Sequence, residues 1–425
     1  MLLRSLSHYA LSILLLSTLS TVHADTWKVL FYMDSGDNLS DMAFKNITDM
    51  VRGAPNDNVE FLIQLHAYYN SGLRYQVTNN GLVFLQEVLM SGDGKQDAID
   101  AAEWAFANNN ADHTMLIFSN HGYGILDPHF NYDTNKWETE FDPVNSTCSG
   151  SSCALLMQKK SIPLHEAHTQ HKGFMFNDQT KTYLNNQDLI DTLAHIKNTI
   201  LKGRTLDILA FDTCMGAMLE VGYQCAPFAR YLVGNQSCSL LDGFEYQGIM
   251  KALNNGNNSP RDVAKGMVNA FDAYYNAHDA SGIYTHTALD LEQVGRVCQA
   301  VDTFAALAIT LPDCQNILDQ IRAKSPRFCL FPMYTDIVEF CTLMDTHLYL
   351  FEPSDTTRAL HLAVHNVQNT VQDAVVARCG GSQTVGLAHG CAIYCPFSHI
   401  DSSYYKTLFA QQCQWLALLE KICNN

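Results

Sequence analysis

Residues 206–216 place a cysteine and an acid at the end of an apolar run. Residues 206–211 have the length and apolar density of a strand buried on both faces, and helical spacing of apolar residues resumes at Met218. Alternating strands and helices are typical of an open α/β sheet. We therefore expect Cys214 at the carboxyl end of a strand, which is where such sheets bind their ligands.

A thiol in this position has two interpretations. The N–H groups and the positive dipole end of a following helix favour the thiolate, which is the nucleophilic form of cysteine. A cysteine beside an apolar strand is equally well explained as a small core residue or as half of a disulfide. A partner histidine is needed to favour the nucleophile.

A second apolar strand, residues 113–119, leads into Asn120-His121-Gly122. If this strand and the cysteine strand are parallel neighbours that stop at the same edge, the imidazole of His121 comes within reach of the Cys214 thiol. Gly122 lets its backbone N–H approach a substrate carbonyl oxygen. The two segments together predict a nucleophilic cysteine with a histidine that transfers its proton.

This order of motifs, strand-His-Gly and then strand-Asp-x-Cys, resembles the clostripain family of cysteine peptidases, within the caspase and legumain clan. The resemblance also covers residues 27–33 with Asp37-Asn38-Leu39, residues 211–223 and, more weakly, residues 393–396. It implies an α/β fold: a three-layer α/β/α sandwich of caspase-like (caspase-haemoglobinase) type with a mainly parallel sheet, plus a smaller, mostly helical C-terminal part.

The resemblance also assigns roles to single residues. It implies that Cys214 attacks a peptide carbonyl, that His121 transfers protons, and that the N–H groups of Gly122 and Cys214 bind the oxyanion. Asp212 matches the family's acid two residues before the nucleophile, and Asp242 matches its second pocket acid by place in the chain. The expected activity is therefore a secreted cysteine endopeptidase that cleaves after arginine or lysine.

Two other functions stay open at this point. The family usually has a serine-containing loop and a Gly-Trp pair near the pocket, whereas this chain has Asn235-Gln236-Ser237 and Gly243-Phe244. A peptidase of the same fold that cleaves after another residue, such as asparagine, fits every argument except the pocket. An inactive binding or scaffold protein fits the fold, although the presence of His121, Gly122 and Cys214 counts against it.

Residues 1–24 have the pattern of a secretory signal peptide. Arg4 gives a basic start, residues 10–19 form an apolar stretch, and Val22-His23-Ala24 is a small-residue cleavage site. The apolar stretch is too short to cross a bilayer, and no later run reaches the ~20 apolar residues that a transmembrane helix needs. We expect a secreted or periplasmic protein without a membrane span.

The charge balance limits the partners. The net charge of −17 becomes −18 when the signal peptide is removed, because Arg4 is the charged residue within it. An acidic protein repels nucleic acid and attracts basic peptides or proteins as substrates. The fourteen cysteines also fit an oxidising compartment.

Length and periodicity divide the mature chain into two expected parts. We predict a catalytic domain over residues 25–290 and a mostly helical C-terminal domain over residues 291–425. Within the first of these parts, residues 125–170 show no periodicity and are rich in polar residues. A loop of this length in a compact domain is usually functional or disordered.

This polar loop contains the dibasic step Lys159-Lys160 and the pair Cys148 and Cys153. Members of the clostripain family are often processed between the histidine and cysteine segments, so self-cleavage after Lys159 or Lys160 is predicted; an ordinary solvated charge pair is the alternative. Cys148 and Cys153 are the expected disulfide.

No cofactor is required for the predicted chemistry, but the resemblance implies calcium. Asp34 and Asp37 have the oxygen atoms that calcium prefers. A turn and a helix cap explain the same two acids equally well.

Overall fold

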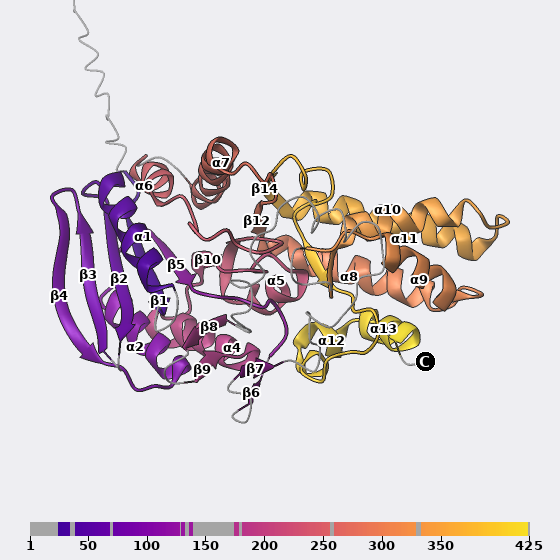
Figure 1. Ribbon diagram of the computed structural model, residues 1–425, viewed down its shortest axis with the longest axis horizontal. Coiled ribbons are helices and arrows are strands. Elements are labelled where there is room, and N and C mark those ends of the chain that lie inside the picture. The colour runs from indigo at the N-terminus through magenta and orange to yellow at the C-terminus, as the bar shows by residue number, and fades with distance from the viewer. Residues whose placement is uncertain are drawn as a thin grey trace, which may run out of the picture.

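The computed structural model describes residues 24–34, 39–68, 71–127, 129–131, 136–138, 174–177, 181–255, 259–328 and 333–423. A nine-stranded sheet with the order β14-β12-β11-β10-β5-β1-β2-β3-β4 runs through its centre (Figure 1). Its strands are β1 (Trp27–Asp34), β2 (Val59–Tyr68), β3 (Ser71–Thr78), β4 (Gly81–Leu89), β5 (His113–Ser119), β10 (Leu206–Asp212), β11 (Ala229–Gly234), β12 (Thr285–Asp290) and β14 (Val375–Gly380).

The middle of the sheet is parallel and its two edges are antiparallel. Strands β11, β10, β5, β1 and β2 run parallel, whereas β12 and β14 on one side and β3 and β4 on the other are antiparallel. Asn79 and Asn80 lie in the turn between β3 and β4. The parallel strands are mostly apolar because helices cover both of their faces.

Helices cover the sheet on both faces, which confirms the predicted α/β class. Along β1, Val29 and Phe31 pack into one core and Leu30 and Tyr32 into the other, as the two-residue period of a strand requires. The first core lies under α1 (Ser40–Gly53), α6 (Tyr246–Asn254) and α7 (Pro260–His278). The second lies under α2 (Gly94–Phe106), α4 (Asn186–His195), which the π-helix Ile196–Ile200 extends, and α5 (Leu219–Cys225).

The C-terminal part is mostly helical and extends away from the sheet in Figure 1. Its helices are α8 (Leu291–Ala308), α9 (Cys314–Lys324), α10 (Ile337–Leu348), α11 (Asp355–Ala374), α12 (Leu408–Gln412) and α13 (Trp415–Cys423), with a 3-10 turn at Tyr404–Lys406. After α11 the chain returns to the main sheet as β14, and the core around α5 continues into this part. The division near Leu291 stays a prediction, and it does not coincide with a break in the core.

The described residues also form three two-stranded sheets beside the main one. They pair β6 (His129–Asn131) with β7 (Lys136–Glu138), β8 (Phe174–Asn177) with β9 (Thr182–Leu184), and β13 (Tyr334–Asp336) with β15 (Ala392–Tyr394). The first pair lies within the predicted polar loop, so this loop is not wholly irregular. Cys148, Cys153, Lys159 and Lys160 lie outside the described residues.

The described cysteines contribute to the core as thiols. Cys225, Cys341, Cys391 and Cys395 are buried and free. Burial raises the pKa of such thiols, as it does for Cys395, and keeps them unreactive. Separately, none of the helices in the described ranges is long and apolar enough to span a bilayer.

Candidate active site

The two chemistry-bearing segments leave the sheet side by side. Strands β5 and β10 are parallel neighbours, and Ser119 is the register partner of Asp212. His121 and Cys214 each follow two residues after this pair. The prediction that the two strands end at one edge is therefore confirmed, and the residues after them lie next to each other.

Gly122 brings the histidine loop into direct contact with the backbone at the cysteine. A Cβ atom at position 122 would lie 2.5 Å from the carbonyl oxygen of Cys214 and 2.6 Å from Oγ1 of Thr213. Any larger side chain would push the loop away. The glycine is thus required by the close approach of the two backbones, which is a different reason from the access of a substrate carbonyl that the sequence suggested.

Cys214 lies in a sharp turn and is partly exposed between buried neighbours. Met215 directly after it has a φ of 58°, which is unusual for a residue with a side chain. The turn is held by Met215 N, which donates to Ser237 O at 3.0 Å. Strained residues of this kind concentrate at functional sites.

The N–H group at the thiol does not come from the following helix. The apolar pattern predicted helical spacing from Met218, and α5 begins at Leu219, so the turn at Met215 lies between the thiol and the helix. Ser239 N instead donates to Sγ of Cys214 at 3.2 Å. A backbone donor from the loop after β11 therefore takes the place that the helix N-terminus was expected to have.

Ser239 is a site residue that sequence reasoning missed. Its Oγ is buried, and its side chain acts on the neighbouring Asp212 as a hydrogen-bond partner that lowers the pKa of that carboxyl. A contact made by a backbone N–H leaves no side-chain signature in a sequence. The sequence signal nearest to this contact was the family's serine-containing loop, and the serine that it drew attention to was Ser237, two residues before Ser239.

Asp212 is buried beneath the loop that follows β11. Its Oδ2 accepts from Tyr246 Oη at 2.6 Å and from Phe244 N at 3.2 Å. Gly243, with a φ of 68°, packs so closely that a Cβ atom there would lie 2.7 Å from the same oxygen. Burial raises the pKa of Asp212 to about 6, although the hydrogen bonds from Tyr246 and Phe244 oppose the rise.

Asp242 lies on the outer side of the same loop and is much more exposed. Its Oδ2 accepts from Tyr274 Oη of α7 at 2.7 Å, and its Oδ1 lies 3.9 Å from Nζ of Lys45 on α1. The contact with Asp242, after burial, helps to raise the pKa of Tyr274 to about 12. Asp242 is next to Gly243 in the chain, and Gly243 packs against Asp212. The hydrogen bonds of the two acids nevertheless come from different helices, α6 for Asp212 and α7 for Asp242.

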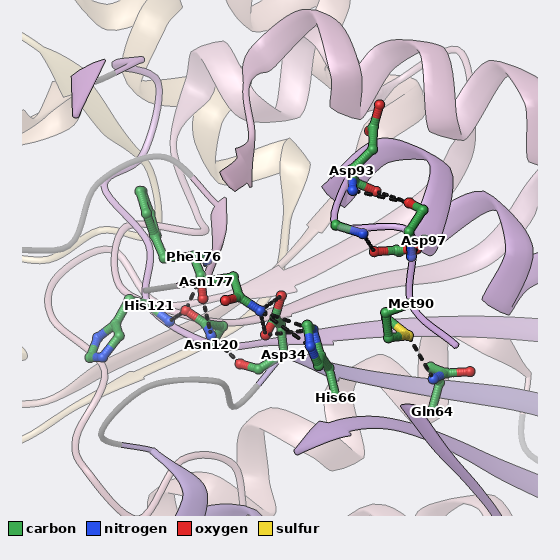
Figure 2. Close-up of polar contacts among 12 residues, drawn as sticks. Asp34, Gln64, His66, Met90, Asp93, Asp97, Asn120, His121, Phe176 and Asn177 are labelled. Atoms are coloured by element: carbon green, nitrogen blue, oxygen red, sulfur yellow. Dashed lines mark hydrogen bonds and ion pairs between the residues drawn. The ribbon is translucent and has the colours of Figure 1, made fainter. Parts of the chain in front are cut away.

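The described residues around Asp34 do not fit calcium. The Asp34 carboxylate accepts from Nδ2 of Asn177 at 3.0 Å and lies 3.3 Å from Nδ1 of His66, so its oxygens face hydrogen-bond donors (Figure 2). Nowhere in the described ranges do three His, Cys, Asp or Glu side chains form a metal-binding group. The helix-cap alternative is wrong for Asp34, because the N-cap of α1 is Leu39. Asp37 lies outside the described residues.

Comparison with known proteins places these features in a family. A model of the clostripain family matches residues 156–421, a stretch that includes Cys214 but not His121. No curated protein matches the sequence.

Several solved structures have the same fold at low sequence identity. The chain is similar to a secreted C11 cysteine protease from Bacteroides thetaiotaomicron, with a TM-score of 0.63, 13% identity, and coverage of 93% of this chain and 99% of that chain. The complex of a secreted C11 cysteine protease from the same organism with an irreversible peptide inhibitor gives a TM-score of 0.60, 14% identity and the same coverage. An inactive zymogen C11 protease from Parabacteroides distasonis gives a TM-score of 0.59 and 13% identity. The match covers 92% of this chain and 99% of that chain.

Proposed function

This chain belongs to the clostripain family of cysteine peptidases, and we propose that it is a secreted endopeptidase that cleaves after arginine or lysine with His121 and Cys214 as its catalytic pair. The observation that carries the proposal is the register of β5 and β10, which pairs Ser119 with Asp212 and so brings the two residues out of the sheet together. The close contact of Gly122 with the Cys214 backbone supports the same arrangement.

In the proposed reaction, His121 takes the proton of the Cys214 thiol and the thiolate attacks the substrate carbonyl carbon. The N–H groups of Gly122 and Cys214 stabilise the oxyanion that forms. The C–N bond then breaks, and His121 gives its proton to the leaving amine, which leaves a thioester on Cys214. Water, deprotonated by His121, hydrolyses this thioester and restores the thiol.

The two pocket acids are proposed to select a basic side chain before the cleaved bond. A guanidinium pairs well with a carboxylate that is recessed from water, and Asp212 is such a group. The net negative charge of the chain attracts basic substrates over longer distances. Secretion through the predicted signal peptide over residues 1–24 is part of the same proposal.

The test of this function is a cleavage profile of the purified mature protein against a peptide library, with Cys214→Ala as the control. Cuts after arginine and lysine that are absent from the control support the proposal. Cuts after asparagine would favour the alternative specificity, and the absence of any cut would favour an inactive scaffold. Active-site labelling of Cys214 that depends on His121 separates that scaffold from a peptidase whose substrate is missing from the library.

We predict that the protein cuts itself within residues 125–170, after Lys159 or Lys160. The two pieces should stay together without a linking disulfide, because β5 before the cut and β10 after it are adjacent strands of the sheet. N-terminal sequencing of active protein should find a new terminus at this step, and both pieces should co-elute on gel filtration.

The control for self-processing is Cys214→Ala, which should remain intact at the same site. Replacing both lysines by glutamine should also prevent the cut. Fully active wild-type protein with an uncut chain across residues 125–170 would refute the prediction.

We propose that calcium, if the protein binds it, is not part of the chemistry. The described oxygen atoms near Asp34 are already engaged by Asn177 and His66. Removing divalent cations with a chelator should therefore leave the hydrolysis rate of the processed enzyme unchanged within experimental error. A loss of activity that added calcium restores, but magnesium does not, would contradict this expectation.

A further inference from the structure

A buried polar cluster lies beside the histidine loop, and the proposed chemistry does not use it. Asp34 at the end of β1, His66 on β2 and Asn177 at the end of β8 are 4%, 2% and 1% exposed. Asp34 and His66 are register partners in the sheet, with Nδ1 of His66 3.3 Å from Oδ1 of Asp34. Nδ2 of Asn177 lies 3.0 Å from each of these atoms, which closes a triangle (Figure 2).

Asn120 connects this triangle to the histidine. Its side chain pairs with the backbone of Phe176, accepting from Phe176 N at 3.1 Å and donating to Phe176 O at 3.0 Å. The same amide donates to Asp34 O, and its oxygen accepts from His121 N. Asn120 is 4% exposed, so it forms these bonds away from water.

The backbone of His121 is held from both sides by this arrangement. His121 N donates to Asn120, and His121 O accepts from Met175 N at 3.3 Å. Gly122 forms an antiparallel bridge with Phe174 one residue further on. Figure 2 shows that the His121 ring points away from the cluster, so the cluster acts on its backbone and leaves the imidazole to the site.

The triangle holds in place the two backbone segments that the Asn120 side chain contacts, at Asp34 and at Phe176. Asn177 ends the strand that contains Phe176, and Asp34 supplies the carbonyl that Asn120 contacts. A buried ion pair is weak evidence for stability, because desolvation offsets the attraction. In some proteins such a pair specifies one arrangement of the surrounding backbone, and here that backbone leads directly to His121.

We propose that Asn120 is a positioning residue for His121, and that Asp34, His66 and Asn177 brace it. The inference rests on the proposed catalytic role of His121. Loss of the brace should let the histidine loop shift relative to β10 while substrate contacts on the β11 side remain. Since a displacement of about 1 Å is enough to cost about a hundredfold in rate, kcat should fall roughly tenfold to a hundredfold with little change in KM.

The test compares Asn120→Ala with Asn254→Ala. Asn254 is a matched control because its side chain also bridges backbone groups, at Asn56 N and Ala54 O, both at 2.8 Å, but at the far end of α1. For each variant, kcat, KM, the thermal midpoint and the pH profile of Cys214 alkylation by iodoacetamide are measured. The alkylation profile reports the coupling of His121 to the thiol and does not depend on turnover.

A second pair of variants separates positioning from simple destabilisation. His66→Gln keeps a hydrogen-bond donor for Asp34, whereas His66→Leu fills the space without one. We expect Asn120→Ala and His66→Leu to lower kcat and to shift the alkylation profile toward that of His121→Ala. We expect His66→Gln to retain most of kcat, and Asn254→Ala to change only the thermal midpoint.

The outcomes distinguish this inference from the proposed function. If His121→Ala leaves both hydrolysis and the alkylation profile unchanged, the catalytic pair itself is wrong. If His121→Ala abolishes hydrolysis but folded Asn120→Ala keeps wild-type kcat and profile, the positioning role is wrong. If Asn120→Ala does not fold, the His66 pair decides: equal kcat in His66→Gln and His66→Leu overturns the proposal, and rescue by glutamine alone supports it.

Discussion

Replacing Cys214 by alanine should lower kcat/KM by at least ~10³-fold, and replacing His121 by alanine should have an effect of similar size. Alanine at position 214 removes the only atom that forms the thioester. Alanine at position 121 leaves the thiol without a base and the leaving amine without an acid. Because the two residues act as one unit, the double variant should be scarcely worse than either single variant. Hydrolysis of an arginine peptide by titrated enzyme measures all three effects.

Two further substitutions control for general damage. Cys379→Ala removes a thiol on β14, at the far edge of the sheet, and His195→Ala removes a surface imidazole that pairs with Glu103. Both should retain near wild-type rates. Circular dichroism should be native for all of the variants. Wild-type rates in Cys214→Ala or His121→Ala, with the fold intact, would remove the mechanism.

The elements around the catalytic pair were predictable because their signals are local. β1, β5 and β10 are mostly apolar, and mostly apolar runs bounded by polar residues predict buried parallel strands. Each run ends in a residue with distinctive chemistry. The adjacency of His121 and Cys214 then followed from one topological assumption, that β5 and β10 are neighbours, and the register confirms it.

The polar network around Asn120 was not predictable from the sequence. Its members come from β1, β2, β8 and the end of β5, and hydrogen bonds between such distant segments leave no spacing pattern. Asp34 illustrates the problem. In the sequence it belongs to an acidic turn that suggested calcium or a helix cap, whereas in the fold its carboxylate lies 3.3 Å from Nδ1 of His66 on the neighbouring strand.

The path of the C-terminal segment was hidden for a different reason. Helices α8 to α11 separate β12 from β14, so the strand that completes the edge of the sheet comes after a long helical stretch. Periodicity identifies the helices and gives no information on where the chain goes after them. The boundary near Leu291 was placed at the change from mixed to helical pattern, although the packed core runs through it.

The second large effect concerns specificity. Asp212→Asn should reduce the preference for arginine over asparagine before the cleaved bond by about tenfold to a hundredfold or more, because a buried carboxylate that would pair a guanidinium becomes neutral. Asp242→Asn should have a smaller effect, since Asp242 is more exposed and its bond from Tyr274 survives the change. Competing arginine, lysine and asparagine peptides give the ratios of kcat/KM directly.

The pKa of Asp212 gives this prediction a second, independent readout. Burial raises this pKa to about 6, so the carboxylate is neutral well below pH 6 and charged above it. The preference for arginine should therefore increase as pH rises through 6 in the wild type and should be independent of pH in this range in Asp212→Asn. Two results would contradict the prediction: a wild type with no preference for arginine, or an undiminished preference in both Asp212→Asn and Asp242→Asn. Either result would mean that the pocket for the basic side chain is not formed by Asp212 and Asp242.

The same shift implies that the protein keeps Asp212 at a cost in stability. The pKa of about 6 against the ordinary value of 3.8 corresponds to about 3 kcal/mol of disfavoured ionisation in the folded state. This penalty is absent below the unfolded pKa and develops fully as pH rises through 6. Asp212→Asn should therefore increase the free energy of unfolding at pH 7 but not at pH 3.5.

Asp127→Asn is the matched control, because burial also raises the pKa of Asp127 to about 6 beside Asn186. It should give a similar gain in stability with no change in substrate preference, whereas a loss of preference in both variants would mean that Asp212 acts through the fold and not by contacting the substrate.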